Sequence, residues 1–249
     1  MPRRAFSLIE LLVAIGIIAL LIGILLPVLA GARTTAQTLA CATQLGQVNL
    51  AALAFAVNHR DQLPSNRTIT APGEHVTWRH LLVDQDYLPE DADVWVCPVG
   101  SPRPASSELG LTDTTTVCVG DIDSNYAING SIAWKGGEHT TDESDTDLVT
   151  IRRPSHTVIF VETQAWYPDL RQEFIPSVLT TWPDGTGSSN GAGPYGFWHQ
   201  GKANWAFYDG HVELLGLRET VVPDSRWHNE TVPPNHLAAW ADQLPDVYR

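Results

Sequence analysis

Three residues near the end of the chain carry side chains that can bind a metal or exchange protons: His199, Asp209 and His211. Imidazoles and carboxylates are frequent zinc ligands and general acids or bases, so a metal or acid–base cluster is one interpretation. The other is structural. Asp209 and Gly210 suit a tight turn, His199 would fix the loop before it, and His211 would begin the return strand. The turn explains Asp209 without a ligand, which favours the structural interpretation.

A second group of oxygen-bearing residues resembles part of a calcium loop. Asp121, Asp123 and Asn125 alternate along the chain, as calcium ligands do. The sixth position lacks the usual glycine, and Ile132 stands where a bidentate Glu is expected. Calcium in these acidic loops is therefore a weak candidate, and no other cofactor is expected. No phosphate-loop (Walker) sequence is present, and no enzymatic activity is expected.

The three cysteines allow one disulfide. Cys97 and Cys118 are predicted to lie outside the cytoplasm, where an oxidising space would let them pair. Cys41 falls on a predicted helix and is interpreted as a small packing residue. Spacing alone does not show that two cysteines approach each other.

The charge of the chain excludes one class of partner. The net charge is −13, and Lys135 and Lys202 are the only lysines. A phosphate-binding surface needs clustered basic residues, so a nucleic-acid partner is not expected.

The candidate residues sit on or beside short elements predicted after the long N-terminal helix. Two strand-like runs flank Asp209-Gly210 over residues 203–215, which predicts a hairpin with a type I′ turn. Further strands are predicted at 94–98, 117–119, 124–130 and 157–162, a helix at 78–83 capped by Thr77, and a last helix at 236–243. Trp78, Trp95 and Trp205 fit core positions on these elements.

The start of the chain predicts a membrane span. Arg3 and Arg4 precede an uncharged, largely apolar run, Leu11–Ala32, which is long enough to cross a bilayer as a helix. The basic residues would stay in the cytoplasm and place everything after Ala32 outside it. A cleaved signal peptide ending at Ala30-Gly31-Ala32 is the alternative. Glu10 at the edge of the apolar run argues against it, and a carboxylate there requires a partner.

The helix is predicted to continue to about His59, bent at Pro27. Beyond the membrane, one side of it forms an approximate apolar stripe that is expected to face a folded head. The stripe comprises Leu39, Thr43, Leu45, Gly46, Leu50, Leu53 and Val57.

Residues 4–13, Arg-Ala-Phe-Ser-Leu-Ile-Glu-Leu-Leu-Val, resemble the cleavage and methylation signal of type IV pilins and type II secretion pseudopilins. The resemblance implies that a prepilin peptidase cuts between Ala5 and Phe6 and methylates the new amine. The family usually has Gly before the cut, where this chain has Ala5. It also implies that Glu10 pairs with the N-terminal amine of a neighbouring subunit in a filament, so that assembly offsets the cost of burying the charge.

A second resemblance lies in the hairpin. His199 and Asp209-Gly210 match the spacing of the H-X9-DG signature of prepilin-like proteins abundant in planctomycete-type bacteria. Such proteins also tend to carry a Cys-Pro segment, here Cys97-Pro98, and a Ser-Asn-Tyr-x-x-Asn-Gly segment, here residues 124–130. The signature identifies kin without assigning chemistry.

Together these features predict an α+β, pilin-like fold, in which a long N-terminal helix packs on a small antiparallel sheet. Residues 1–5 form the leader, 6–32 the transmembrane helix, 33–60 its amphipathic extension, and 61–249 the exported head with the hairpin at 199–215. The expected function is that of a structural subunit of a type IV pilus or a secretion pseudopilus. The sequence does not separate these two, nor a major from a minor subunit.

The expected partners are the prepilin peptidase, other pilin or pseudopilin subunits, the inner-membrane assembly machinery and membrane lipid. The expected location is the inner membrane, with the N-terminus in the cytoplasm, and a filament after assembly. Two alternatives stay open. One is a membrane-anchored binding or metal-dependent domain that uses the pilin signal only for export, and the other is an adhesin-like tip subunit that binds through the Trp182–Trp198 loop.

Overall fold

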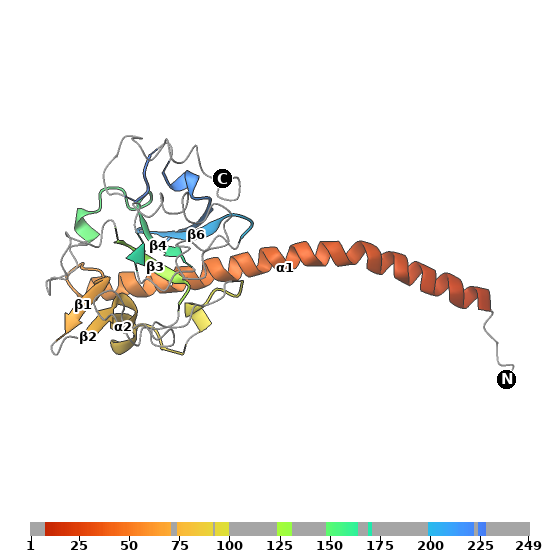
Figure 1. The fold of residues 1–249 in the computed structure, drawn as a ribbon, viewed down its shortest axis with the longest axis horizontal. Coiled ribbons are helices and arrows are strands. Elements are labelled where there is room, and N and C mark those ends of the chain that lie inside the picture. Colours follow the sequence, from red (N-terminus) through yellow and green to blue (C-terminus); the bar gives the residue numbers. More distant parts are fainter. Residues whose placement is uncertain are drawn as a thin grey trace. The chain divides into compact units, whose positions relative to one another are not determined.

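The computed structural model describes residues 8–70, 74–91, 93–99, 124–130, 148–163, 169–170, 199–221 and 224–227. The chain divides into two compact units, Met1–Leu39 and Ala40–Arg249, which are described separately. Figure 1 labels the main elements.

The first unit contains the beginning of helix α1, which spans Leu8–Asn58 with Pro27 inside it. The structure therefore confirms the predicted continuous N-terminal helix. Three threonines follow the apolar run, and each hydroxyl donates to the backbone carbonyl four residues earlier at 3.0–3.1 Å. These side chains, Thr34, Thr35 and Thr38, thereby satisfy their hydroxyls within the helix itself.

The second unit begins with the remainder of α1, which packs against the head through small and apolar side chains. Its buried residues are Cys41, Leu45, Val48, Asn49, Ala51, Ala52, Phe55 and Ala56. Asn49 Nδ2 donates to the Phe207 carbonyl at 2.9 Å, which requires close approach of helix and strand. The predicted stripe is wrong at Leu39, Thr43, Leu50 and Val57, which are exposed. The side that faces the head instead combines three alanines, Ala51, Ala52 and Ala56, with larger apolar side chains such as Leu45 and Phe55.

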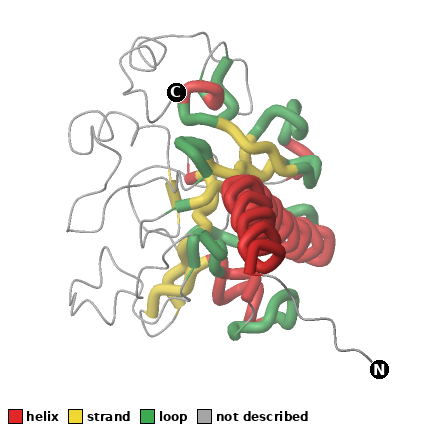
Figure 2. The backbone as a smooth tube through the Cα atoms, turned by 90° about the vertical axis from the view of Figure 1, so that its right-hand side faces the viewer, coloured by secondary structure: helices red, strands yellow, loops and turns green. Residues whose placement is uncertain are grey.

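A five-stranded sheet forms the centre of this unit, in the order β5-β3-β4-β6-β7. The strands are β3 (Tyr126–Asn129), β4 (Val158–Glu162), β5 (Asp169–Leu170), β6 (Ala203–Phe207) and β7 (Val212–Leu215). β3, β4, β6 and β7 pair antiparallel, and the short edge strand β5 runs parallel to β3. The predicted α+β class with a small antiparallel sheet is therefore confirmed, and the strands lie beside the helices in Figure 2.

The three central strands are fully buried, so both faces of the sheet are covered. Phe160 and Ala206 are cross-strand partners and belong to the core cluster that includes Trp78 and Trp95. Trp205 packs edge-on against Trp227, with ring centroids 5.4 Å apart. The predicted core positions of Trp78, Trp95 and Trp205 are confirmed, since each is at most 1% exposed.

Shorter elements complete the described part of the second unit. Helix α2 (Trp78–Asp84) starts after its predicted N-cap, Thr77, and β1 (Arg67–Thr70) pairs with β2 (Glu74–Thr77) in a separate hairpin. The predicted strand at 94–98 is wrong. Residues Asp93–Trp95 form a 3₁₀ turn, η1, and Trp95 Nε1 donates to the Pro89 carbonyl at 2.9 Å, which fixes the indole in the core. The predictions at 117–119, 182–198 and 236–243 lie outside the described residues.

Candidate functional site

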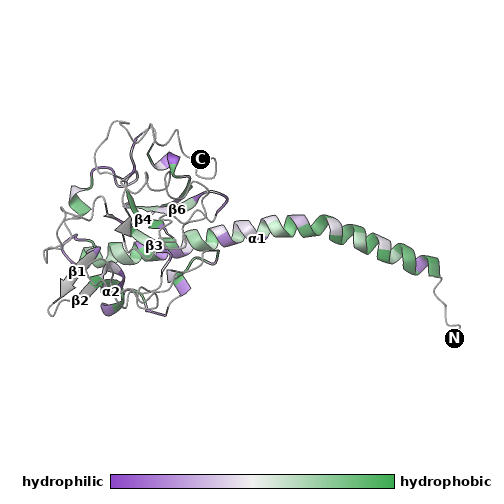
Figure 3. Cartoon of the chain, viewed as in Figure 1, coloured by the Kyte–Doolittle hydropathy of each residue, from purple (hydrophilic) through white to green (hydrophobic). Residues whose placement is uncertain are grey.

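The N-terminal part of α1 presents an apolar surface that the chain itself does not cover. Every large apolar side chain from Leu8 to Leu29 is at least half exposed. The helix is long and apolar enough to cross a membrane, and the green of its first turns in Figure 3 shows the same composition. Burying such a side chain is worth about 1.5–3 kcal/mol. Lipid or apolar partner chains must therefore cover this segment.

Glu10 lies in the first turn of this helix and is exposed. The N-terminus of a helix favours a negative charge, because its backbone N–H groups carry partial positive charge. The predicted processing residues, Ala5 and Phe6, lie outside the described residues.

The disulfide of the protein joins Cys41 to Cys97, with 4.9 Å between the Cα atoms. The predicted Cys97–Cys118 pair is wrong, because Cys97 forms one disulfide only, and Cys41 is more than a packing residue. Cys118 lies outside the described residues. The bond links α1 to the segment that follows η1, and both cysteines are fully buried.

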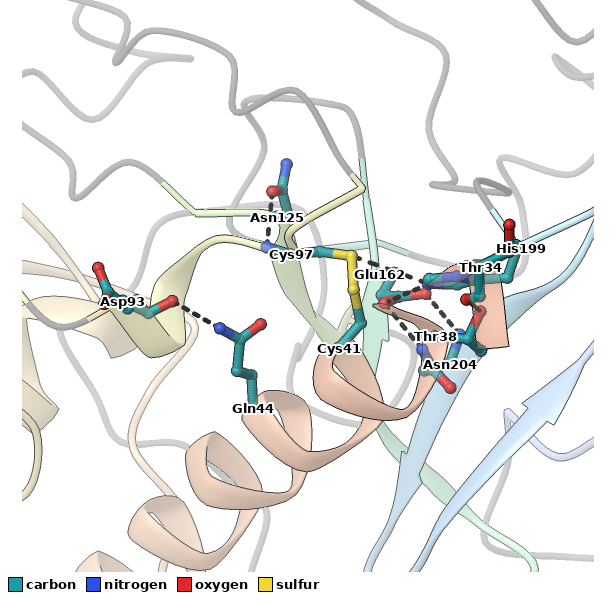
Figure 4. The surroundings of a disulfide bond; sticks show 10 residues. All are labelled: Thr34, Thr38, Cys41, Gln44, Asp93, Cys97, Asn125, Glu162, His199 and Asn204. Atoms are coloured by element: carbon teal, nitrogen blue, oxygen red, sulfur yellow. Dashed lines mark hydrogen bonds and ion pairs between the residues drawn. A yellow bond between two sulfur atoms is a disulfide. The ribbon is translucent and has the colours of Figure 1, made fainter. Parts of the chain in front are cut away.

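Two ionisable side chains lie against this disulfide (Figure 4). His199 Nε2 is 3.8 Å from Cys97 Sγ and 3.1 Å from Glu162 Oε1. Glu162 also accepts from the Asn204 backbone N–H at 2.6 Å and from Asn204 Nδ2 at 3.0 Å. A carboxylate offers only acceptor atoms, so Nε2 of His199 carries the proton in this contact. Glu162, His199 and Asn204 are all at least 97% buried.

Asn125 holds the backbone on the other side of the disulfide. Its Oδ1 accepts from the Cys97 N–H at 3.0 Å, and the residue is fully buried. This structural bond accounts for the Asn125 side chain, which the sequence marked as a weak calcium ligand. The two acids of that candidate, Asp121 and Asp123, lie outside the described residues.

A tight turn positions His199. His199 and Lys202 exchange two backbone hydrogen bonds of 3.2 Å, and both residues between them have positive φ, 58° at Gln200 and 82° at Gly201. Positive φ at both central positions is the mark of a type I′ turn. The structure thus has its type I′ geometry at Gln200-Gly201, where the sequence did not predict it.

The turn at Asp209-Gly210 is of a different type from the one predicted. Gly210 has a φ of +96°, but Asp209 is not among the positive-φ residues. Gly210 N–H donates to the Phe207 carbonyl, and Phe207 N–H to the His211 carbonyl, each at 3.0 Å. This is the three-residue loop whose last residue, a glycine, makes a bulge. Asp209 Oδ1 accepts from the His211 N–H at 3.2 Å, so Asp209 does belong to the turn but stabilises it through its side chain rather than through a positive φ.

The three histidine and aspartate candidates do not form one cluster. His199 precedes β6 and Asp209 follows it, so the five residues of that strand separate them by about 17 Å of extended chain. Asp209 and His211 pair with each other at the exposed end. A metal held jointly by His199 and Asp209 is therefore incompatible with the fold.

The structure assembles a different group that sequence reasoning missed. One ligand atom each from Cys41, Cys97, Glu162 and His199 lie within 4.8 Å of one another, and all four residues are buried. They come from α1, the segment after η1, β4 and the turn before β6. His199 and Cys97 were singled out from the sequence separately, and the signal that was missed is a carboxylate, Glu162, ending an otherwise apolar strand.

Comparison with known proteins bears on the first 26 residues. A family model of the prokaryotic N-terminal methylation motif matches residues 1–26. No curated protein and no solved structure matches the chain. The chain therefore carries a type IV pilin-like signal at the start of a single long apolar helix, as an exported, membrane-anchored protein of pilin or pseudopilin type does.

Proposed function

We propose that this chain is a structural pilin-like subunit that assembles into a type IV pilus or a type II secretion pseudopilus. A prepilin peptidase removes residues 1–5 and methylates Phe6. The helix is then stored in the inner membrane with its N-terminus in the cytoplasm, and assembly machinery later extracts it into a filament. The observation that carries the proposal is the methylation motif over residues 1–26 together with the uncovered apolar helix that begins inside it.

The second unit supports this role because it has a core of its own. Its sheet and the last part of α1 bury the large aromatic residues together, and a disulfide ties that part of α1 to the head. A head stabilised in this way can stay folded while the apolar helix exchanges lipid for neighbouring helices.

The exposed side of α1 within this unit supplies a further contact surface. Leu50 and Val57 are 60% and 72% exposed, and their spacing of seven residues places them on one side of the helix. Side chains of this size exposed on a helix gain free energy when a neighbouring subunit covers them.

Processing is the first test of the proposal. The chain is expressed with and without a prepilin peptidase, and the membrane fraction is analysed by intact mass and N-terminal sequencing. The expected product with the peptidase starts at N-methylated Phe6, and without it at the original N-terminus. A chain that begins after Ala32 in both strains would identify an ordinary signal peptide and refute the pilin pathway.

Assembly is the second test, and Glu10 gives it a matched pair of variants. Glu10→Gln removes the charge and keeps the shape, whereas Glu10→Asp keeps the charge. Processing and membrane insertion are expected in both, because neither change makes the helix less apolar. Filament yield, measured by shearing and sedimentation, is expected to fall strongly for Glu10→Gln and less for Glu10→Asp. Equal yields from Glu10→Gln and wild type would rule out charge pairing at this position.

A deletion strain distinguishes the two kinds of filament. Loss of surface filaments with normal secretion would indicate a pilus, and loss of secretion would indicate a pseudopilus.

A second candidate function is an anchored, metal-dependent exported domain, and the buried group of Cys41, Cys97, Glu162 and His199 favours it. That function would survive deletion of the assembly machinery, whereas the function of a filament subunit would not.

A further inference from the structure

The disulfide of this protein lies in surroundings that a purely structural disulfide does not require. His199 contacts it, and Glu162, which is paired with His199, has a carboxylate oxygen within 4.8 Å of both sulfur atoms; both side chains are buried. Burying a charged group costs free energy, and apolar residues of similar size often stabilise a core as well or better. A carboxylate and an imidazole at this place therefore point to a chemical use.

We propose that, when Cys41 and Cys97 are thiols, these two residues bind one Zn²⁺ together with His199 and Glu162. Two thiolates, one imidazole nitrogen and one carboxylate oxygen form a donor set that zinc accepts in a closed tetrahedral site. The same four residues thus hold either a disulfide or a metal ion, and the redox state selects between them.

The donor atoms of Cys97, His199 and Glu162 already lie at about the spacing that this site needs. Zinc–ligand bonds of about 2.0–2.3 Å in a tetrahedron place neighbouring ligand atoms roughly 3.3–3.8 Å apart. Cys97 Sγ lies 3.8 Å from His199 Nε2, and His199 Nε2 lies 3.1 Å from Glu162 Oε1. The His199–Glu162 distance must lengthen slightly, and the two sulfur atoms must separate, which rotation of the Cys41 and Cys97 side chains provides.

The charge balance also favours the exchange. Zn²⁺ and two thiolates sum to zero, as the disulfide does, so replacing one by the other adds no net charge to this buried region. Asn204 holds both carboxylate oxygens of Glu162 through its backbone N–H and its amide. Such outer hydrogen bonds orient the ligands of a metal site.

A dithiol reductant gives two electrons and two protons to the Cys41–Cys97 bond, which opens to two thiols while the reductant leaves as its own disulfide. Zn²⁺ then displaces one proton from each thiol and binds both sulfurs. His199 binds through Nε2 in its Nδ1–H tautomer, and the two thiol protons leave to solvent. A chain newly delivered across the membrane already has thiols and needs no reductant.

The test uses the full chain in detergent with Zn²⁺ as the probe. Tris(2-carboxyethyl)phosphine reduces the disulfide; the phosphine takes up the oxygen of water, and both sulfurs leave as thiols. A chromogenic chelator then competes for Zn²⁺. Cys118→Ser serves as the parent, so that the third thiol does not contribute. We expect one Zn²⁺ per reduced chain, held more tightly than about 100 nM, and none per oxidised chain.

Variants assign the ligands. His199→Gln and Glu162→Gln should each weaken binding by more than the roughly 10–100-fold that loss of an outer hydrogen bond costs, and Asn204→Ala should weaken it within that range. His211→Gln is the matched control, because this histidine is exposed and lies at the other end of β6. It should bind as the parent does. Co²⁺ in place of Zn²⁺ should give the absorption of a tetrahedral thiolate site.

Two binding results would overturn the proposal. One is a reduced chain that takes up no Zn²⁺ at micromolar concentration. The other is uptake that survives in the His199→Gln/Glu162→Gln double variant. Alkylation of Cys41 and Cys97, followed by mass spectrometry, gives a readout that does not depend on the variants. Zn²⁺ should slow it in the reduced parent. If the reduced chain unfolds, Zn²⁺ must restore its thermal transition, and a failure to do so also refutes the site.

Discussion

Breaking the Cys41–Cys97 disulfide should destabilise the second unit by about 4 kcal/mol in the absence of metal. The two cysteines are 56 residues apart in the sequence. For a closed loop of that length, the cross-link removes about 14 cal/mol/K of entropy from the unfolded chain, or about 4 kcal/mol at 25 °C. Both cysteines are fully buried, so the double variant Cys41→Ala/Cys97→Ala also loses some packing.

The assay is urea unfolding of the full chain in detergent, followed by tryptophan fluorescence. Four buried tryptophans, Trp78, Trp95, Trp205 and Trp227, report on the core of the second unit. The double alanine variant and the reduced wild type with a chelator should lose similar free energies of unfolding. Cys118→Ser should unfold as the wild type does, because the disulfide does not include Cys118. A loss below about 1 kcal/mol in the double variant, or an equal loss in Cys118→Ser, would refute the assignment of this bond and its role.

Three smaller changes test other parts of the second unit. Burial, and next the charge of Glu162, raise the pKa of Tyr126 above its usual range, and its buried hydroxyl has no hydrogen-bond partner among the described residues. Tyr126→Phe should therefore stabilise the fold by up to about 1 kcal/mol in urea unfolding. A loss of stability above about 1 kcal/mol would show that the hydroxyl is hydrogen-bonded. Gly210→Ala should lower the free energy of unfolding by about 1–2 kcal/mol, because the φ of Gly210 is +96°. Steric contact is not the cause, since the added Cβ would meet nothing closer than 3.9 Å, and Gly210→Asn should cost less. Equal stability of the wild type and both variants would contradict the turn geometry. Burial, and next the neighbouring cation Arg153, lower the pKa of His156 below its ordinary value of about 6.5. The unfolded chain therefore binds this proton more readily than the folded chain, so stability falls as the pH drops through 6.5 towards the lower folded pKa. Unfolding curves at several pH values should show that His156→Gln loses less stability over this range than the wild type does. An identical pH dependence in the two proteins would exclude this cause.

Much of the fold followed from local patterns. The uninterrupted apolar run predicted α1, the β-branched run predicted β4, and Thr77 predicted the start of α2. These patterns work because helix and strand periodicity and caps depend on residues near in sequence. The strand predicted at 94–98 failed because its apolar residues include Trp95, which packs into the core from a 3₁₀ turn rather than from a sheet.

The candidate site was predicted only in part. His199 and Asp209 were singled out together, but β6 holds them at opposite ends. Cys41 was interpreted as a packing residue and Glu162 as the end of a strand, although the two meet beside His199. The turn type was also placed at the wrong dipeptide. Asn-Gly and Asp-Gly favour type I′ turns. Strand register, however, decides at which glycine the other central residue of the turn also has a positive φ.

The sequence by itself determined the apolar helix, the signal at residues 1–26 and the pilin-like interpretation, because each depends on residue type and order within one continuous segment. The tertiary structure alone decided which cysteine pairs with Cys97, which side of α1 faces the head, and that Glu162 and His199 share the disulfide's surroundings. Those facts depend on contacts between residues far apart in the chain. Such contacts are fixed only when helix and sheet pack together, since the number of residues between two elements does not set the distance between them in space.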